Sequence, residues 1–487
     1  MKILMLNPPY FRKFSRSQRS PAVTKSGCIY YPIWLAYATG VLEEVGHEVR
    51  LVDAPGDGYD LDQVIDMAKE FQPELTVVDT STPSIYNDVK VAERIKAEIN
   101  TFITLVGTHV SALPEESFSL SPAIDAIARH EYDYTIRDLA HCLQEKNNLA
   151  SVQGLSFKED GKVVHNPDRP YIKNLDELPF VSKVYKKHLH IENYFYGANR
   201  HPVVTILGGR GCPHRCIYCV YPQTFTGRKY RYRSVRDVVD ELVYIKDTFP
   251  QAKEVFLEDD TLTVNRKRSL ELADEILARG LKITWSTNSR ADADFETLRA
   301  IKKAGCRLLC VGFESGNQQI LDRMNKRLTV QQSREFMKNA KKVGMLIHGC
   351  FLVGLPGEDK STMQQTLDLA MELRPDTVQF FPIMVYPGTE AYDWANDNHY
   401  LITTNYSEWL TSEGLHNCVV SRPGLTNREL VEFCDFARHT FYMRPSYFLS
   451  KFRQIIFDPR EGKRIIKAFR TSIKYLIRGS FSNTKSV

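Results

Sequence analysis

The sequence predicts an α/β protein built from two parallel sheets and followed by a helical C-terminal region. Two stretches, residues 1–145 and 196–400, alternate short apolar runs of strand type with segments of helical spacing. Between them, at 146–195, turn pairs such as Asp160-Gly161 interrupt the alternation. Such alternation is typical of parallel sheets covered by helices, so we expect two α/β units joined by a linker.

Length and composition agree with this division. A chain of 487 residues exceeds what one hydrophobic core usually supports, and 43% apolar with 25% charged residues is ordinary for a globular protein. The sequence shows no signal-peptide pattern and no run of about 18 apolar residues, so we expect a cytoplasmic location. In that compartment the ten cysteines are expected to bind metal or to be buried rather than to form disulfides.

Residues 1–145 are expected to form a Rossmann-like domain. Helical spacing appears at 60–72 and 87–98, between apolar runs that predict five strands: KILML, EVRLV, ELTVVD, FITLV and AIDAIA. Ligands of such sheets bind at the carboxyl ends of the strands.

Residues 196–400 are expected to form a partial (β/α)6 barrel of the TIM type, because six strand-like runs alternate with helical segments. These runs are VVTILG, EVFLED, KITWS, RLLCVGF, LIHGCFLV and TVQFFPIMV. The chemistry of such a barrel lies at the carboxyl ends of its strands. Residues 401–487 are expected to be mostly helical.

Three cysteines follow the first barrel strand in the loop GGRGCPHRCIYCVYP. Cys212, Cys216 and Cys219 are spaced C-x3-C-x2-C. Three thiolates in one loop suit an iron–sulfur cluster and leave one iron of a cubane without a protein ligand. The alternatives are chance burial or a zinc site with a distant fourth ligand, although no partner pair of cysteines is visible. Cys306, Cys310 and Cys350 lie in or beside strands and are expected to be structural.

This spacing, with Tyr218 just before the third cysteine, resembles the signature of the radical S-adenosylmethionine (SAM) superfamily. The resemblance implies a [4Fe–4S] cluster on Cys212, Cys216 and Cys219, whose open iron chelates SAM. It also implies that one electron from the cluster cleaves SAM to methionine and a 5′-deoxyadenosyl radical.

By the same resemblance, residues at later strand ends would hold SAM, although each alone could be a structural turn or a surface charge. Arginine and the acidic residues would bind the methionyl end and the ribose, and the glycines would let the backbone approach the adenosine. The candidates, besides Tyr218, are Glu258, Asp259, Asn288, Arg290, Glu314, Gly354, Pro356 and Gly357.

The N-terminal region, with LNPP, VDTST and VGTHVSALPEE, resembles the cobalamin (B12)-binding class of radical SAM proteins. The resemblance implies cobalamin between the domains, with its nucleotide tail along the first sheet. The motif D-x-H-x-x-G, which supplies a histidine ligand to cobalt in other B12 domains, does not occur, so we expect cobalamin without a protein histidine ligand or, alternatively, a domain that has lost cobalamin. The candidate contacts are Asn7, Pro8, Pro9, Thr80, Ser81, Thr82, Gly107, Thr108 and His109.

The positive charge of the chain lies at its C-terminus. Residues 444–487 hold 11 Lys and Arg against Asp458 and Glu461, a net charge of +9, whereas the whole chain carries +5. At 463–477 apolar and basic residues fall on opposite sides of a helix, which fits a helix lying on an anionic membrane surface. The alternative is a helix packed on the barrel. Because the basic excess is confined to this tail, no nucleic-acid partner is expected.

Together these features predict a cobalamin-dependent radical SAM enzyme that abstracts hydrogen from an unactivated carbon and then transfers methyl from methylcobalamin. Similar proteins include the anaerobic magnesium-protoporphyrin ester cyclase-like, hopanoid-type and class B methyltransferase members. Ring closure, ring contraction or oxidation without methyl transfer is therefore an alternative, and a cobalamin or iron–sulfur sensor is another. Methylthiotransferases carry three further cluster cysteines in the N-terminal domain, where only Cys28 and Cys142 occur.

The expected partners follow from this chemistry. They are a small-molecule or lipid-like substrate and an electron donor such as flavodoxin or ferredoxin. A lipid-like substrate would suit a tail that contacts the inner face of the membrane.

Overall fold

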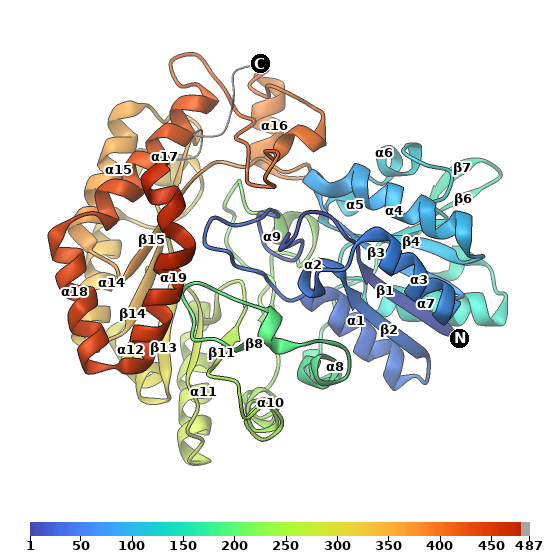
Figure 1. Ribbon diagram of the computed structural model, residues 1–487, viewed down its shortest axis with the longest axis horizontal. Helices are drawn as coiled ribbons and strands as arrows, with labels where there is room; N and C mark the ends of the chain where they lie inside the picture. The colour runs from blue at the N-terminus through green and yellow to red at the C-terminus, as the bar shows by residue number, and fades with distance from the viewer. Residues whose placement is uncertain (479–487) are drawn as a thin grey trace.

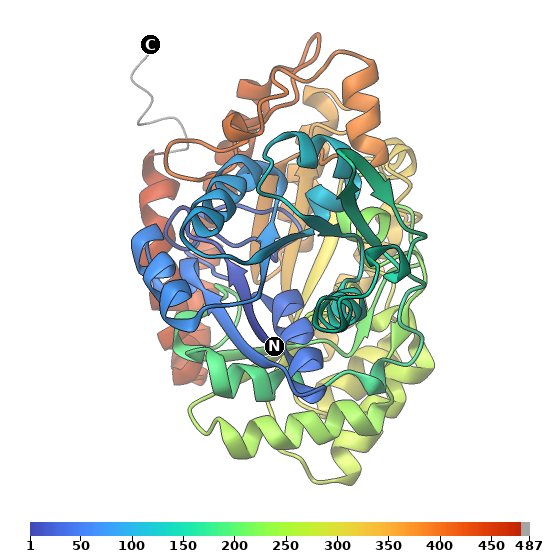
Figure 2. The same cartoon turned by 90° about the vertical axis from the view of Figure 1, so that its right-hand side faces the viewer.

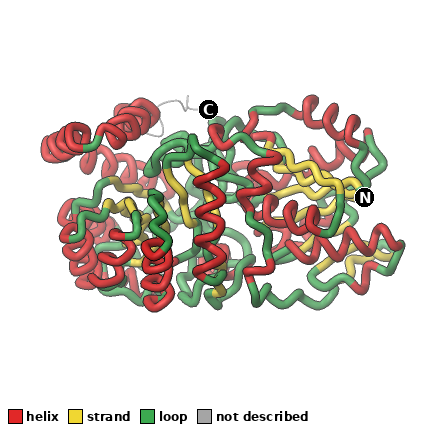
Figure 3. Tube along the Cα trace, turned by 90° about the horizontal axis from the view of Figure 1, so that it is seen from below, coloured by secondary structure: helices red, strands yellow, loops and turns green. Residues whose placement is uncertain are grey.

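The computed structural model describes the backbone of residues 1–478 and the side chains of residues 1–469. Figure 1 shows two α/β halves side by side, the N-terminal half at the right and the second half at the left. Seen from below in Figure 3, the strands form separate yellow groups with green loops between them. The two expected parallel sheets are confirmed.

The first sheet has seven strands, of which five are parallel and two form an antiparallel hairpin at one edge. In spatial order they are β2 (Glu48–Asp53), β1 (Lys2–Asn7), β3 (Leu75–Thr80), β4 (Phe102–Gly107), β5 (Ala126–Ala128), β6 (Leu155–Glu159) and β7 (Lys162–His165). Every residue of β3 is buried, as expected for a central strand covered on both faces.

Helices cover both faces of this sheet. On one face α1 (Ile33–Glu44) packs against α7 (Asp133–Glu145), and on the other α3 (Leu61–Phe71) packs against α4 (Ile85–Glu98). The right-handed crossovers between parallel strands place the two pairs on opposite faces, because the strand order reverses at β1. A ligand crevice at the carboxyl ends is the usual result of this reversal.

The second sheet is a partial barrel of six parallel strands in chain order, open between its first and last strands. They are β8 (Val203–Ile206), β11 (Glu254–Leu257), β12 (Trp285–Arg290), β13 (Cys306–Glu314), β14 (Leu346–Val353) and β15 (Thr377–Pro382). The helices between these strands are the short α9 (Val220–Thr224), followed by α10 (Val235–Thr248), α11 (Arg266–Ala278), α12 (Phe295–Lys303), α13 (Gln318–Arg323), α14 (Val330–Lys342) and α15 (Lys360–Leu373).

One barrel strand lies further along the chain than the sequence indicates. The run KITWS predicts a strand over 282–286, but β12 spans Trp285–Arg290. Residues 281–284 are partly or fully exposed, whereas Trp285 is buried and begins the pairing with β11. The strand therefore consists mainly of polar residues, which an apolar pattern does not detect.

The segment between the sheets joins both. The hairpin of β6 and β7 extends the first sheet, and α8 (Val181–His188) packs against α1 and α10. Figure 2 shows the hairpin beside the parallel strands of the N-terminal half.

The C-terminal region is helical only from residue 427 onward. Residues 401–426 contain isolated β-bridges and the short turn Tyr406–Trp409, so the helical part of this region begins later than residue 401. Tyr406 and Trp409 are buried because this stretch packs over α4 of the N-terminal half. The helices that follow are α17 (Asn427–Tyr442), α18 (Pro445–Phe457) and α19 (Pro459–Arg478).

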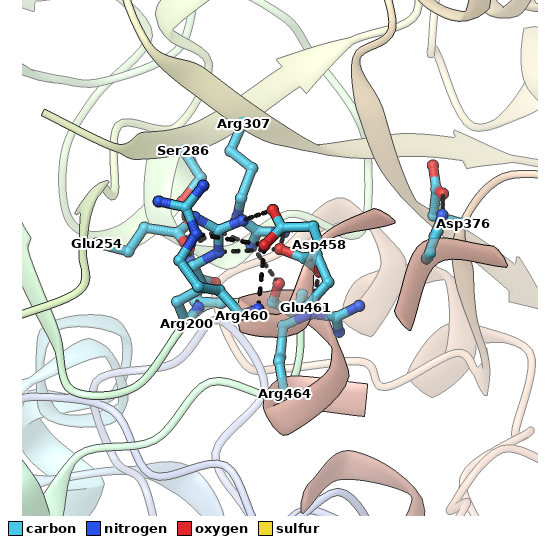
Figure 4. A network of polar contacts seen from close by, with 12 residues as sticks. Arg200, Glu254, Ser286, Arg307, Asp376, Asp458, Arg460, Glu461 and Arg464 are labelled. Carbon is cyan, nitrogen blue, oxygen red and sulfur yellow. Dashed lines mark hydrogen bonds and ion pairs between the residues drawn. The ribbon is translucent and has the colours of Figure 1, made fainter. Parts of the chain in front are cut away.

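A buried ion-pair network attaches α19 to the barrel at the amino ends of its strands (Figure 4). Glu461 accepts from Arg200 at 3.0 Å, from Arg307 at 3.1 Å and from Arg464 at 2.8 Å. Arg307 also pairs with Glu254 at the start of β11, at 2.9 Å. Glu461 therefore contacts all three guanidinium groups, while Glu254 and Asp458 supply further negative charge to Arg307 and Arg200.

No helix in the described part of the chain combines the length and the apolar character needed to cross a membrane.

Replacing Glu461 by Gln is expected to lower the free energy of unfolding by about 3 kcal/mol, because it removes the shared negative charge among three buried arginines. Urea unfolding followed by tryptophan fluorescence measures this loss. The matched control is Glu296→Gln, which breaks an exposed pair with Arg299 and should change stability by less than about 1 kcal/mol. Equal effects of the two substitutions would show that the network does not anchor α19.

Candidate active site between the two sheets

The loops that follow the carboxyl ends of the two sheets meet between the halves of the molecule. Arg19, in the long segment between β1 and α1, donates to Glu258 at 2.8 Å and to Asp260 at 3.0 Å, just after β11. Tyr221, beyond the cysteine loop, donates to the carbonyl of Ser17 at 2.5 Å. The site is therefore built by both halves.

The cysteine loop is closed at its base by a short antiparallel ribbon of β9 (Gly209–Arg210) and β10 (Arg231–Tyr232). Just inside it, the amide of Cys212 donates to the carbonyl of Gly227 at 3.2 Å. Gly211 has φ 86°, and a Cβ there would lie 2.4 Å from the carbonyl oxygen of Lys229. The loop thus begins with a turn that only glycine can adopt. This turn determines the position of Cys212, the next residue.

The three thiols lie near one another in a partly buried site. Cys216 is buried, and Cys212 and Cys219 are partly so. Burial and the nearby charge of Asp260 raise the pKa of the Cys212 thiol to about 11 and raise the pKa of Cys219 further. A negative charge on Cys216 would raise both pKa values as well. In the free protein these two thiols are therefore protonated at neutral pH, so a metal that binds them must displace protons.

The donor set fits an iron–sulfur cluster by its chemistry and its place in the fold. Within residues 1–469 no three His, Cys, Asp or Glu side chains are already arranged around a metal position. The three thiols nonetheless lie within eight residues of one loop beyond the carboxyl end of β8, where the amide of Cys219 donates to the carbonyl of Cys216 at 3.3 Å. Thiolates are the ligands that such clusters use.

A small pocket beside the loop holds the Arg19 ion pairs. Burial disfavours the charge of Arg19, but Asp260 and Glu258 hold its pKa above the ordinary value. Oε2 of Glu258 is buried without a hydrogen-bond partner, which leaves an acceptor available to a ligand. The pocket is lined by Ser17, Arg19, Ile33, Trp34, Leu207, Gly209, Arg210, Tyr221, Glu258 and Asp260.

Three of the predicted SAM contacts lie beside this pocket or the cysteines. Asn288 donates to the backbone carbonyl of Asp259 at 2.9 Å and to Glu258 at 3.4 Å. Arg290 donates to the backbone carbonyls of Lys326 and Arg327, and its charge partly opposes the rise in the pKa of Cys212 that burial causes.

The third, Glu314, pairs with Lys326 at 2.8 Å, and burial together with the charge of Glu314 raises the pKa of Tyr218. Glu314 has φ 64°, a strained conformation for a residue with a side chain, and such strain is common at functional sites. Tyr218 and Glu314 thus connect the cysteine loop to the end of β13.

The other residues that were predicted to contact SAM are engaged by neighbouring residues of the protein. Asp259 is fully buried and accepts from the amide of Gly208 and the hydroxyl of Tyr230, both at 2.6 Å. A Cβ on Gly354 would meet Leu430 and Ile383, and one on Gly357 would collide with Arg323. Pro356 is half-buried in the turn between these glycines.

The first group of predicted cobalamin contacts, at the end of β1, takes part in an internal network. Asn7 donates to Asp53 at 2.7 Å and accepts from Arg16 at 2.8 Å. The carbonyl of Pro8 accepts from Arg16 at 2.7 Å, and that of Pro9 accepts from Asn87. The polar groups of these residues are therefore engaged by contacts within the protein.

The second group, at the ends of β3 and β4, fits a bound ligand better. Gly107 has φ 124°, and a Cβ there would lie 2.3 Å from the carbonyl oxygen of Thr80. Nδ1 of His109 is 3.2 Å from the hydroxyl of Thr82, whereas its Nε2 is buried without a partner. Burial lowers the pKa of His109 to about 3, so the ring is neutral. A bare backbone edge and an unsatisfied ring nitrogen together suit a polar ligand tail.

Ser81 and Thr108 complete this second group. Ser81 is buried and shares a hydrogen bond with Ser84 at 2.7 Å, and Thr108 is half-buried at the start of α5 (Thr108–Ala112).

Two buried arginines of the ribbon connect the cysteine loop to the first sheet. Arg210 donates to both oxygens of Asp133, at 2.7 and 3.1 Å, and Arg231 donates to both oxygens of Glu131, at 2.8 and 2.6 Å. Both acids follow β5. The base of the cluster loop is therefore held against the carboxyl end of the N-terminal sheet.

Sequence patterns did not identify Arg19, Arg210 or Arg231 as site residues. Each lies in a loop or at its edge, where no periodicity marks a position, and their partners are 77 to 241 residues away. The one available signal for Arg19 is the length of the segment between the first strand and the first helix.

Gly107→Ala is expected to weaken cobalamin binding at least about ten-fold, because the added Cβ collides with the Thr80 carbonyl and displaces the start of α5. Equilibrium dialysis with hydroxocobalamin measures the affinity, and far-UV circular dichroism checks the fold. Gly46→Ala is the control, since Gly46 also has a positive φ but a Cβ there meets nothing within 4 Å. A similar affinity for both variants would place the cobalamin tail elsewhere.

Comparisons with known proteins agree with this geometry. Residues 206–370 match the model of the radical SAM superfamily, and residues 19–140 match that of the B12 binding domain. The chain is 32% identical over 447 residues to the uncharacterized methyltransferase PH0819 of Pyrococcus horikoshii, covering 91% of this chain and 93% of that protein. It is 27% identical to the anaerobic magnesium-protoporphyrin IX monomethyl ester cyclase of Cereibacter sphaeroides, covering 90% and 71%.

Among solved structures, the radical SAM methyltransferase TsrM of Kitasatospora setae has the same fold, with a TM-score of 0.69 at 18% identity and coverage of 90% of both chains. The family matches assign to this chain a [4Fe–4S] cluster, SAM and cobalamin as cofactors. The chain belongs to the radical SAM superfamily, and within it to the enzymes that carry a B12-binding domain ahead of the radical SAM domain.

Proposed function

We propose that this enzyme transfers a methyl group from cobalamin to an unactivated carbon after a SAM-derived radical has abstracted hydrogen from it. The observation that carries the proposal is the pairing of Arg210 and Arg231 with Asp133 and Glu131. These contacts hold the cysteine loop directly against the carboxyl end of the cobalamin sheet, so two cofactors would face one substrate without an intervening domain.

When bound, the cluster supplies the electron that cleaves SAM, and cobalamin supplies a carrier for methyl. The residues of the chain position and shield these groups. Cys212, Cys216 and Cys219 would hold the iron, and Tyr218 would support the loop through Glu314. Glu258 offers its unsatisfied oxygen to a bound cation or hydroxyl group.

Arg19 has to exchange partners when a ligand enters. In the free protein its guanidinium pairs with Glu258 and Asp260, which follow β11. A ligand that brings an ammonium or hydroxyl group to Glu258 would release Arg19, which could then bind a carboxylate or phosphate. The segment that carries it would thereby exclude water from the site.

We expect a small-molecule or lipid-like substrate, which would contact the aromatic side chains of Trp34 and Tyr221. The pocket beside Arg19 is too small to hold such a molecule, so the substrate enters only when the Arg19 side chain moves. The reaction also needs an external electron donor, and a flavodoxin or ferredoxin would serve.

Radical ring closure or oxidation without methyl transfer is the second candidate, because the relative in Cereibacter sphaeroides is a cyclase. A sensor that binds both cofactors without turnover is the third. The three differ in their products from SAM, so one assay separates them.

The test is anaerobic reconstitution with iron and sulfide, followed by dithionite and SAM with and without methylcobalamin. We expect 5′-deoxyadenosine and cobalamin-dependent S-adenosylhomocysteine, measured by mass spectrometry. Deoxyadenosine without S-adenosylhomocysteine would favour ring closure or oxidation. Neither product, with both cofactors bound, would favour the sensor.

Cys216→Ala is expected to abolish the broad absorbance of the reconstituted cluster and reduce deoxyadenosine to background, because two thiolates do not retain the cubane. Cys142→Ala is the control, since Cys142 is buried in α7 and donates to a backbone carbonyl. A cluster that survives the first substitution, or is lost with the second, would place the iron elsewhere.

A further inference from the structure

Exposed apolar side chains are concentrated in the C-terminal helices. Of the fourteen large apolar side chains that are exposed within residues 1–469, nine lie between residues 436 and 469. Phe452 is 61% exposed, Ile456 58% and Phe457 84%. Soluble surfaces rarely group so many, and a contiguous apolar patch usually marks an interaction site.

Seven of these side chains lie on α18 and α19 and are called here the C-terminal apolar face. On α18, Phe448, Phe452 and Ile456 recur every four residues and so share one side of the helix. The members are Phe448, Leu449, Phe452, Ile456, Phe457, Ile466 and Phe469.

The opposite side of α18 is anchored to the barrel. Lys451 is buried and pairs with Asp376 at 3.7 Å, and Gln454 donates to the same carboxylate at 2.7 Å. The apolar side of α18 consequently points away from the protein. Figures 1 and 2 both place the C-terminal helices at an outer edge of the molecule.

The first half of α19 is oriented in the same way. Arg464 is buried, donating to Glu461 at 2.8 Å and to the carbonyl of Gly197 at 3.1 Å, whereas Ile466 and Phe469 are about half exposed. At the junction a Cβ on Gly462 would lie 3.2 Å from Ile455, so the two helices pack closely there. Residues 470–477 of the expected amphipathic segment have side chains outside the described part of the chain.

The charge around this face has one sign. Its two acids, Asp458 and Glu461, are engaged by Arg200, Arg307 and Arg464. Arg453 and Lys463 are exposed beside the apolar residues. The surface therefore presents aromatic and aliphatic groups bordered by cations, the composition of segments that insert among anionic lipid headgroups.

We propose that the C-terminal apolar face of α18 and α19 docks the enzyme on an anionic lipid bilayer. The apolar side chains enter the boundary between headgroups and acyl chains, and the flanking cations bind the headgroups. The inference depends on this surface alone and does not require the proposed methyl transfer. Because α19 is attached at the amino ends of the barrel strands and the candidate site lies at their carboxyl ends, docking leaves the site unblocked.

The test is flotation of the full-length protein with vesicles of phosphatidylcholine alone or with about one third phosphatidylglycerol. We expect binding to the anionic vesicles, weakened when salt is raised from about 0.1 to about 0.5 M. The variant Phe452→Ser/Ile456→Ser/Phe457→Ser should lower the partition coefficient at least about ten-fold. Arg453→Gln/Lys463→Gln should lower it about ten-fold on anionic vesicles only.

The matched control is Val45→Ser/Leu277→Ser/Ile402→Ser, which removes three exposed apolar side chains elsewhere and should bind as the unsubstituted protein does. Absence of binding to anionic vesicles, or equal binding by both triple variants, would overturn the proposal. Sedimentation velocity tests the alternative that a second copy of the chain binds to this face. A dimer that the Phe452 variant abolishes, with no vesicle binding, would assign the face to a second copy of the chain.

Discussion

The two pairs formed by Arg210 with Asp133 and by Arg231 with Glu131 determine how the halves of this enzyme fit together. All four side chains are nearly inaccessible, and each guanidinium uses two nitrogens on one carboxylate. Moving the cysteine loop away from the first sheet would leave buried charges without partners, which costs several kcal/mol. The spacing between the two cofactor sites is therefore set by side chains at the site, and less by the segment that links the sheets.

The sequence alone was sufficient for the sheets and the cysteine loop, because buried parallel strands are apolar runs and the thiol spacing is specific. It was insufficient where polar residues form the strand or make the contacts between elements. Strand β12 begins at Trp285 and continues through the polar residues from Ser286 to Arg290, which no apolar pattern marks. The irregular segment 401–426 packs over α4 of the N-terminal half. Its conformation therefore depends on a helix that is remote in sequence.

The acids that the sequence predicts as SAM contacts differ in orientation from one position to the next. Three acids follow β11, and in extended backbone successive side chains point to opposite sides. Glu258 and Asp260 consequently face Arg19, whereas Asp259 turns inward to Gly208 and Tyr230. A motif identifies the strand end, but only the register of the chain decides which of the three acids meets a ligand. The position of Arg19 could not be foreseen, since its partners are more than 200 residues away.

The attachment of α19 also bears on how the chain is made. Arg200 and Arg307 belong to segments that leave the ribosome long before Glu461, the carboxylate they share. Before Glu461 has been made, Arg307 can pair with Glu254, while the amino ends of the barrel strands remain open to water. Residues 458–464 cover the amino ends of the barrel strands, so this end of the barrel is shielded from water only after a segment that follows all six strands in the chain has folded against it.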